Sequence, residues 1–511
     1  MEFKIITHEL EGVSSNYIVL NPKTALKNDL MPGTLLKTSD GKYGFRLITS
    51  SVIEQGLAAI SDENLKLNSI KEGQILNFIP AGVEGVTRII RRKMQKRTLT
   101  DTEIDTFIQS LNSGLLTNSH LASFGTAVEI NGMQEKEIVS VAKSILNYSK
   151  KMEFPGKQVV DKHSIGGIAG NRITPIIVPI IASIDLKIPK VSTRAITSPA
   201  GTVDALEVVT NPNLDFDEAV EIVNKTNGCM VNGATVGLGD TADKFLSSVK
   251  QIKVDPREMM IASILAKKKA AGADFVIIDL PTGKGSKLES RDDARRLAYD
   301  FSAIGNKIDL KVECIISPGD KPIGTMIGPS LEMTEVLNTL EGNAADLLLK
   351  RKALSIAGLI LENKGFADRG QGERIAEDIL DSGKAYSKFK EIVEAQGGDS
   401  IISSKTIPKA PYNYAITADR DDIVYSLDSY NIGMMARAAG APNDKMAGIV
   451  LHVDRGDAIK KGDKILEIHS HSEGKIDEAI AKDSGMSEED TVATMSTFVF
   501  PSVEDQLSEK W

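Results

Sequence analysis

The feature that most constrains the fold is a regular alternation of short apolar runs with longer helical runs in the middle of the chain. The apolar runs are rich in β-branched residues, have the length of strands, and lie at 159–160, 188–191, 276–279 and 312–316. Strands that alternate with helices are typical of an α/β sheet with helices packed on its faces. The alternation therefore predicts an α/β fold for this part of the chain.

The sequence on either side of this region has a different character. A chain of 511 residues is too long for one hydrophobic core, so we expect several domains. Residues 1–86 combine short β-branched runs with turn signals and predict an N-terminal β-rich domain. Residues 87–160 carry apolar positions at helical spacing and predict a helical domain. Residues 161–404 form the predicted central α/β domain, and the Gly-Asp turns of residues 405–511 predict a C-terminal α+β domain.

The charge balance restricts the class of partner. Lysine and arginine number 61 against 70 aspartates and glutamates, so the net charge is −9 at pH 7. An acidic chain repels nucleic acid and anionic membrane surfaces, and we expect neither as a partner. The basic segment 87–97 departs from this average. It has no interleaved aromatic residues, which favours a solvated helix or linker over a nucleic-acid site.

The cysteines and histidines indicate the cellular compartment and whether a metal site is expected. Cys229 and Cys314 are far apart and belong to no metal-binding pattern, so we expect a reducing, cytoplasmic location without disulfides. His469 and His471 lack the spacing of a zinc site, and we expect no metal. No apolar run approaches the roughly 20 residues of a membrane span.

Three polar loops follow predicted strands and share a composition of Gly, Ser, Thr and Lys. They are DKHSIGG at 161–167, STRAITSPAGT at 192–202 and PTGKGSK at 281–287. Glycine lets backbone N–H groups approach an anion, and lysine and hydroxyl side chains add donors. A single loop of this kind is usually only a tight turn. Three of them at the carboxyl ends of strands, where open α/β sheets bind ligands, predict a phosphate-binding site.

A strong helix start signal follows at Asp255-Pro256, with aspartate expected at the N-cap and proline at the first helical position. Further along this helix, Ser263 and Lys267 are four residues apart and share a face. These residues alone fit either a capped surface helix or one wall of a site.

Four separated motifs in the same order resemble the thymidine phosphorylase and AMP phosphorylase superfamily: residues 161–167, 192–202, 263–268 and 382–399. The length and the TRAITSPAGT loop look most like the long AMP phosphorylases. The resemblance implies a helical domain, with a returning segment at about 240–270, and a large α/β domain around a cleft. It also implies the extra N-terminal β-rich domain, the C-terminal α+β domain, and a homodimer or larger homo-oligomer.

The resemblance also implies roles for individual residues, matched motif by motif. Asp255 corresponds to the proton donor. The residues that match phosphate-binding positions are Lys162, Ser164, Thr174 and Ser192. The residues that match substrate-binding positions are Gly167, Thr193, Arg194, Ala195, Ile196, Thr197, Ser198, Thr202, Ser263, Lys267 and Lys287. Inorganic phosphate is a co-substrate, and no cofactor is implied.

The activity implied by the resemblance is phosphorolysis of a nucleoside 5′-monophosphate, foremost AMP, to the base and ribose 1,5-bisphosphate. The alternative is a thymidine or other pyrimidine nucleoside phosphorylase. Relatives of that kind carry an arginine before the 263–268 motif, whereas this chain has Phe-Leu-Ser-Ser-Val at 245–249. A phosphoribosyltransferase and a non-catalytic assembly protein are weaker alternatives, and Asp255 remains either a general acid or a helix cap.

Overall fold

The computed structural model describes residues 1–8, 16–67, 70–195, 198–238, 240–250, 252–343, 346–484 and 493–496. The chain divides into two compact units. The first contains residues 1–150 and 239–267, and the second contains residues 151–238 and 268–511. Each unit therefore combines segments that are distant in sequence.

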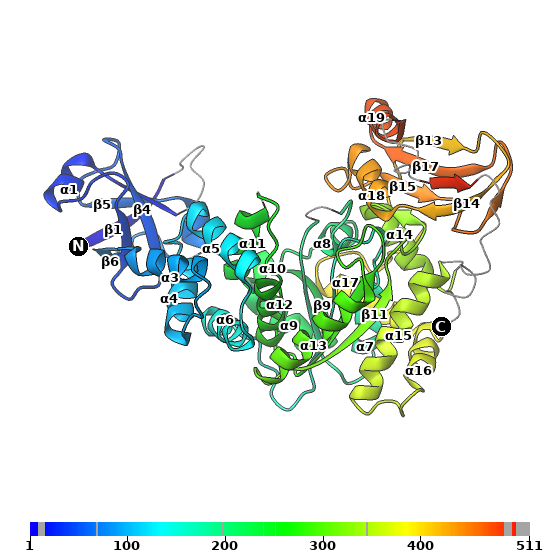
Figure 1. Ribbon diagram of the computed structural model, residues 1–511, viewed down its shortest axis with the longest axis horizontal. Coiled ribbons are helices and arrows are strands. Elements are labelled where there is room, and N and C mark those ends of the chain that lie inside the picture. Colours follow the sequence, from blue (N-terminus) through cyan, green and yellow to red (C-terminus); the bar gives the residue numbers. More distant parts are fainter. Residues whose placement is uncertain are drawn as a thin grey trace. The chain divides into compact units, whose positions relative to one another are not determined.

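The chain begins with a closed barrel in the first unit (Figure 1). Around the barrel the strands are β1 (Glu2–Thr7), β5 (Leu57–Ile60), β2 (Tyr17–Leu20), β4 (Gly44–Thr49), β3 (Leu35–Thr38) and β6 (Ile75–Pro80). Two short helices, α1 (Pro22–Lys27) and α2 (Asp62–Leu67), connect strands. The buried rings of Phe3, Phe45 and Phe78 pack inside, with centroids 6.0 Å apart in each neighbouring pair. Closure leaves the barrel without free strand edges.

Helices make up the rest of the first unit. They are α3 (Glu84–Met94), α4 (Asp101–Asn112), α5 (Asn118–Asn131), α6 (Glu135–Tyr148), α11 (Asp240–Lys250) and the greater part of α12 (Arg257–Ala270). The stacked rings of Phe107 and Phe124 lie 3.9 Å apart, and Phe245 of the returning segment contacts Phe124 edge-on. The basic segment 87–97 lies largely on α3, where arginines near its end are not buried but Lys93 is.

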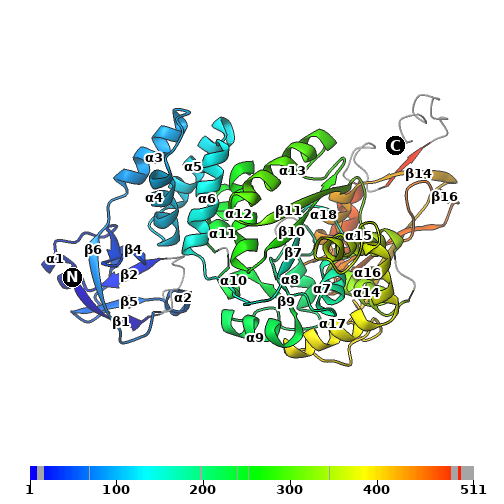
Figure 2. The ribbon, with the colours of Figure 1, turned by 90° about the horizontal axis from the view of Figure 1, so that it is seen from below.

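The second unit is built on parallel strands (Figure 2), which confirms the α/β sheet predicted from the alternation. The strands β11 (Lys311–Pro318), β10 (Phe275–Thr282) and β7 (Val160–Ser164) form one sheet, and β8 (Ile188–Ser192) pairs with β9 (Gly228–Asn232). A parallel bridge between Val159 and Lys187 joins β7 to β8. The flanking helices are α7 (Thr174–Ala182), α8 (Thr202–Leu206), α9 (Phe216–Thr226), α10 (Gly233–Val236), α13 (Arg291–Asn306), α14 (Pro329–Leu340), α15 (Leu347–Asn363), α16 (Gly372–Asp381) and α17 (Lys384–Ala395).

The end of the chain adds two small antiparallel sheets to the second unit. One contains β12 (Met326–Ile327), β15 (Gly448–Leu451), β17 (Lys464–Ser470) and β13 (Tyr412–Thr417), and the other contains β16 (Ala458–Ile459), β14 (Asp422–Leu427) and β18 (Ala493–Ser496). Helices α18 (Ser429–Ala438) and α19 (Glu473–Ser484) pack on each other, as Figure 1 shows. Strand β12 comes from the middle of the chain and pairs with β15, so this part is tied to the central sheet region.

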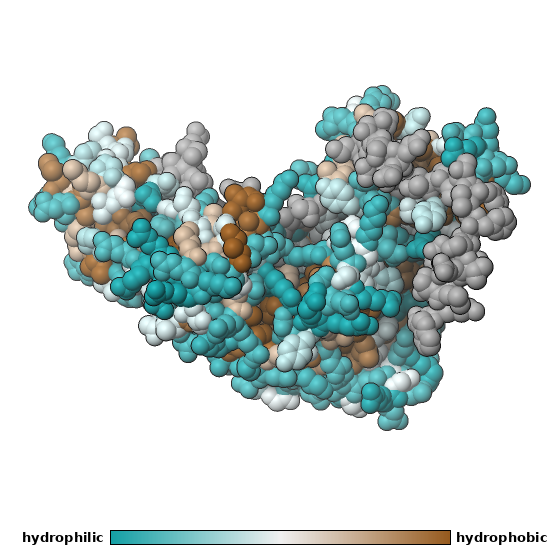
Figure 3. Space-filling model, in the orientation of Figure 1, coloured by the Kyte–Doolittle hydropathy of each residue, from teal (hydrophilic) through white to brown (hydrophobic). Residues whose placement is uncertain are grey.

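The surface is that expected of a chain whose apolar residues are largely buried. The face in Figure 3 is mostly hydrophilic, with apolar residues in separate patches. Within the described ranges, no helix has the length and apolar character needed to cross a membrane.

One buried ion pair in the first unit gives a stability prediction. Lys93 donates to Glu137 at 2.9 Å, and Glu137 also accepts from the Leu99 N–H at 3.0 Å. Both charged side chains are buried, at 4% and 1% exposure. Glu137→Ala leaves the lysine buried without its carboxylate, and we expect the free energy of unfolding to fall by about 3 kcal/mol or more. Urea unfolding measures the change, with the exposed Glu129→Ala as the control. Equal stability of the two variants would contradict the prediction.

Candidate functional site

The loops that sequence motifs single out gather at one edge of the sheet. The bridge between Val159 and Lys187 sets the register of β7 against β8. Continued along both strands, it places Ser164 opposite Ser192, and the pairing of β7 with β10 places Asp279 on the other side of Ser164. Because parallel strands end at the same edge, the loops that follow these strands lie together.

Buried charges lie just inside this edge. Asp161 pairs with Lys268 at 2.7 Å and with Lys190 at 3.5 Å. Asp279 pairs with Lys352 at 2.8 Å and accepts from the Ser317 hydroxyl at 2.5 Å. These buried lysines and Lys162 form what we call the lysine cluster: Lys162, Lys190, Lys268 and Lys352. The cluster outnumbers its two aspartates, which favours an anion nearby.

Lys162 is the member of the cluster that we single out for binding an anion. Its Nζ atom lies 3.5 Å from the hydroxyl of Ser164 at the end of β7. Burial is the main effect that lowers its pKa, to about 7; Lys352 and Arg172 lower it further, while Asp279 and Asp161 oppose the shift. Lys162 therefore changes charge near neutral pH, and an anion bound beside it would hold the proton in place.

The ends of β7 and β8 offer donors to such an anion. The Ser192 hydroxyl is buried and makes no hydrogen bond within the described part of the protein. Gly167 has φ +113°, which only glycine adopts without strain, and a Cβ atom there or at Gly166 would meet nothing within 4 Å. The backbone at these glycines is thus open to a ligand. Thr174 is buried at the first residue of α7.

Arg172, which the sequence motifs did not single out, holds the loop after β8 in place through hydrogen bonds. It donates to Glu332 at 2.6 Å, to the Thr202 hydroxyl at 2.9 Å and to the Ala200 carbonyl at 2.9 Å. Because Thr202 accepts this hydrogen bond, its own hydroxyl proton is available to a ligand. A lone arginine directly before a strongly apolar helix was the signal that could have identified this residue.

Asp204 is a second residue that sequence reasoning missed. It is buried at 3% exposure and accepts from the backbone N–H groups of Ala195 at 2.7 Å and Gly201 at 2.9 Å. The loop folds back so closely that a Cβ atom on Gly201 would lie 2.3 Å from the Ala195 nitrogen. Asp204 therefore sets the backbone conformation of the loop that was predicted to bind substrate.

Arg194 from that loop is held by carboxylates of the protein itself. It donates to Glu207 at 2.7 Å and to Asp204 at 3.4 Å. Burial acts to raise the pKa of Glu207, but hydrogen bonds from Arg194, Lys445 and Asn213 outweigh it and lower that pKa to about 2. Thr193 is exposed, and the Ser198 hydroxyl bonds to the Ala200 carbonyl at 3.0 Å. Ile196 and Thr197 lie outside the described residues.

The remaining predicted site residues come from α12, from the segment before it and from the loop after β10. Asp255, Ser263 and Lys267 belong to the first unit, whereas the loops after β7 and β8 belong to the second. Ser263 is buried on α12, with Lys267 one turn further on. Lys287 is exposed in the loop after β10, within the second unit. Among the described residues, no group of three His, Cys, Asp or Glu side chains could hold a metal ion.

The helix start differs from the expected one. Helix α12 begins at Arg257, and the carbonyl of Pro256 accepts from the Met260 N–H at 3.0 Å. The residue whose carbonyl accepts the first helical bond is the N-cap, so Pro256 holds that position. Asp255, half-buried, lies one residue before it, so α12 begins one residue later than expected.

Family models match three successive parts of the chain. A "glycosyl transferase family, helical bundle domain" matches residues 87–149, a "glycosyl transferase family, a/b domain" matches 156–386, and a "pyrimidine nucleoside phosphorylase C-terminal domain" matches 423–486. Among solved structures, anthranilate phosphoribosyltransferase from Thermus thermophilus is similar with a TM-score of 0.51 and 14% identity. The similarity covers 61% of this chain and 99% of that one, and it shows a shared fold.

Curated relatives match almost end to end. The AMP phosphorylase of Pyrococcus furiosus is 40% identical over 91% of this chain and 92% of its own length. That of Thermococcus kodakarensis is 39% identical over 92% of this chain and 94% of its own length. Identity at this level over whole chains accompanies a common fold and a common set of motifs, and the chain belongs to the AMP phosphorylase family.

Proposed function

We propose that this protein is a phosphorylase that splits AMP with inorganic phosphate to give adenine and ribose 1,5-bisphosphate. The observation that carries the proposal is the sequence match to AMP phosphorylases over nine-tenths of the chain. The lysine cluster supports it as well, because its positive charge, the open glycines and the hydroxyl donors at the same sheet edge suit the binding of phosphate. We expect the reaction to take place in the cytoplasm, in a homodimer or larger homo-oligomer, and without a cofactor.

The phosphate acts as the nucleophile in this reaction. One of its oxygens bonds to C1′ of the ribose while the bond from C1′ to the base nitrogen breaks. The transition state carries positive charge on the ribosyl group, so a phosphate held close to C1′ both attacks and stabilises it. Our proposed phosphate-binding residues are Lys162, Ser164, Thr174 and Ser192, with Thr202 beside them.

The base leaves with the electron pair of the broken bond and needs a proton. We assign Asp255 as the donor, since the resemblance matches it to this role and it lies half-buried just before α12. We assign the nucleotide to Gly167, the loop from Thr193 to Ser198, Thr202, Ser263, Lys267 and Lys287. Positive charge on Lys287 suits the 5′-phosphate that distinguishes a nucleotide from a nucleoside.

The substrate class is tested by phosphate-dependent release of free base from AMP, CMP, UMP, adenosine, thymidine and uridine. We expect release from AMP and none from adenosine, because the 5′-phosphate supplies binding energy that the nucleoside lacks. Chromatography of the released base, with and without inorganic phosphate, gives the answer. Release from thymidine or uridine in place of AMP would move the protein to the pyrimidine nucleoside branch.

Lys162 gives a pH dependence whose sign follows from its pKa of about 7. An anion binds to the protonated lysine, so binding weakens as the pH rises and the proton is lost. Sulfate does not titrate in this range, so the pH dependence of its binding reports on groups of the protein. We expect its inhibition constant to rise with pH above 7, approaching about tenfold per pH unit.

The matched variant is Lys162→Arg, because arginine keeps its charge throughout this range. Its sulfate inhibition constant should not change between pH 7 and 9. A wild-type enzyme with the same flat profile would show that Lys162 is not the group beside the anion.

Asp255→Asn tests the general acid. The amide keeps the size of the side chain but cannot give up a proton, so we expect kcat for AMP to fall by about 10²-fold or more with little change in KM. Glu258→Gln, on the first turn of α12, is the matched control. Turnover of the Asp255→Asn enzyme at the control's level would exclude the acid role.

A further inference from the structure

One face of α18 contacts both loops at the sheet edge. Ser429, Gly433 and Arg437 are four residues apart and so lie on the same side of the helix. The Ser429 hydroxyl accepts from the Ala169 N–H at 3.0 Å, just after the Gly166-Gly167 turn. An added Cβ at Gly433 would lie 3.3 Å from Pro199 of the loop after β8. Because glycine has no side chain, this loop packs directly on the helix.

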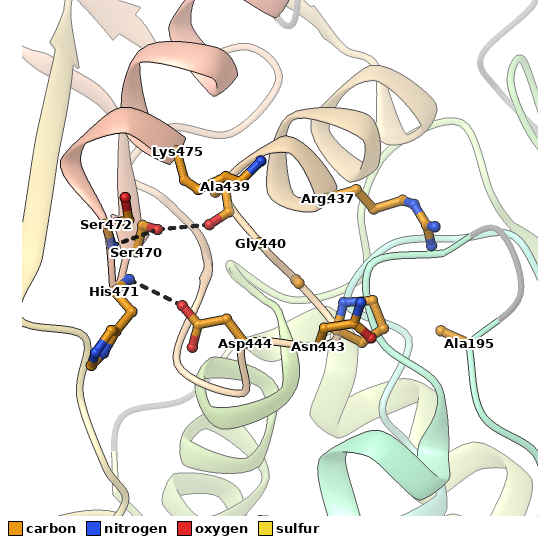
Figure 4. A pocket seen from close by; sticks show the side chains of 12 residues that line it. Ala195, Arg437, Ala439, Gly440, Asn443, Asp444, Ser470, His471, Ser472 and Lys475 are labelled. Carbon is orange, nitrogen blue, oxygen red and sulfur yellow. Dashed lines mark hydrogen bonds between the residues drawn. The ribbon is translucent and has the colours of Figure 1, made fainter.

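Arg437 completes this face by holding the second loop through its backbone. Its guanidinium donates to the Ser198 carbonyl at 3.1 Å. Figure 4 shows the side chain extending from α18 toward the segment that carries Ala195. Arg437 and Ala195 both line a cavity of about 780 Å³ between the loop and the C-terminal part of the chain. Arg437 is thus a direct link from the C-terminal sheets to the loop.

Lys445 provides a second link, through the buried Asp204. Its ammonium lies 3.4 Å from Asp204 and 2.9 Å from Glu207, and its own carbonyl accepts from the Ser330 N–H at 2.9 Å. Asp204 is the carboxylate that holds the Ala195 and Gly201 N–H groups. A nearby positive charge stabilises a buried carboxylate. Lys445 and Arg194 supply it, and Lys445 is anchored outside the loop.

We propose that Arg437 and Lys445 are positioning residues that hold the described parts of the loop after β8, residues 193–195 and 198–202, in the conformation that binds substrate. Arg437 acts on the Ser198 carbonyl, and Lys445 acts through its ion pair with Asp204. Neither residue needs to contact the substrate. The inference rests on the proposed function, because it gives the C-terminal part of the chain a role in nucleotide binding by that loop.

Hydrogen exchange tests the positioning without any substrate. Asp204 protects the Ala195 and Gly201 amides, so weaker support should expose them. We expect the peptide that carries both amides to exchange about tenfold faster in Arg437→Met and in Lys445→Met. The control is Lys464→Met, whose lysine pairs with Glu467 at the surface of the same sheets. Exchange at the wild-type rate in both Arg437→Met and Lys445→Met would overturn the proposal.

Activity supplies the second readout. If Lys445 acts through Asp204, the losses of kcat/KM for AMP in Lys445→Met and Asp204→Asn should not add in the double variant. Each single variant should lose about tenfold or more, and Lys445→Arg should recover most of the loss. Additive losses, or a lower melting temperature with unchanged kcat/KM, would overturn the proposal. A wild-type enzyme inactive on AMP would instead reject the proposed function and leave the exchange result valid.

Discussion

The arrangement of the site depends on buried charges that lie just inside the carboxyl edge of a parallel sheet. Asp161 and Asp279 each neutralise lysines from neighbouring elements, at 2.7 Å to Lys268 and 2.8 Å to Lys352. Burying unpaired lysines is costly, so these carboxylates are what permits the lysine cluster to exist. Lys162 differs from the other three lysines of the cluster, which each pair with an aspartate, whereas the described residues give Lys162 no ion pair. We propose that an anion bound at the strand ends balances the charge of these lysines.

Buried charges also hold the backbone of the loop after β8. Asp204 accepts hydrogen bonds from two N–H groups of this loop, and Arg172 donates to the Ala200 carbonyl. Both are buried ions, each with a counter-ion from a different part of the chain, Lys445 for Asp204 and Glu332 for Arg172. The loop conformation therefore depends on α14 and on the C-terminal sheets as much as on its own sequence.

The sequence was sufficient to predict the sheet and the gathering of its loops, because apolar β-branched runs and Gly-Ser-Lys loops are local signals. Arg172, Asp204, Arg437 and Lys445 were not recognised, since their roles come from partners far away in the chain. Asp204 and Lys445 are 241 residues apart, and Arg172 and Glu332 are 160 apart. Helix α12 begins one residue later than the Asp255-Pro256 signal predicts, because sequence signals fix a helix end only to within one or two residues. Burial of Lys162, which sets its pKa, likewise cannot be read from a motif.

The most direct test of this account is a crystal structure of the protein with inorganic phosphate. We expect a phosphate at the ends of β7 and β8, with oxygens within hydrogen-bond distance of Lys162 Nζ and the Ser192 hydroxyl. We also expect the Thr202 hydroxyl to accept from Arg172 in that structure, as it does here. A phosphate bound elsewhere, with the Lys162 and Ser192 side chains making no contact to it, would contradict the central claim that the lysine cluster exists to bind this anion.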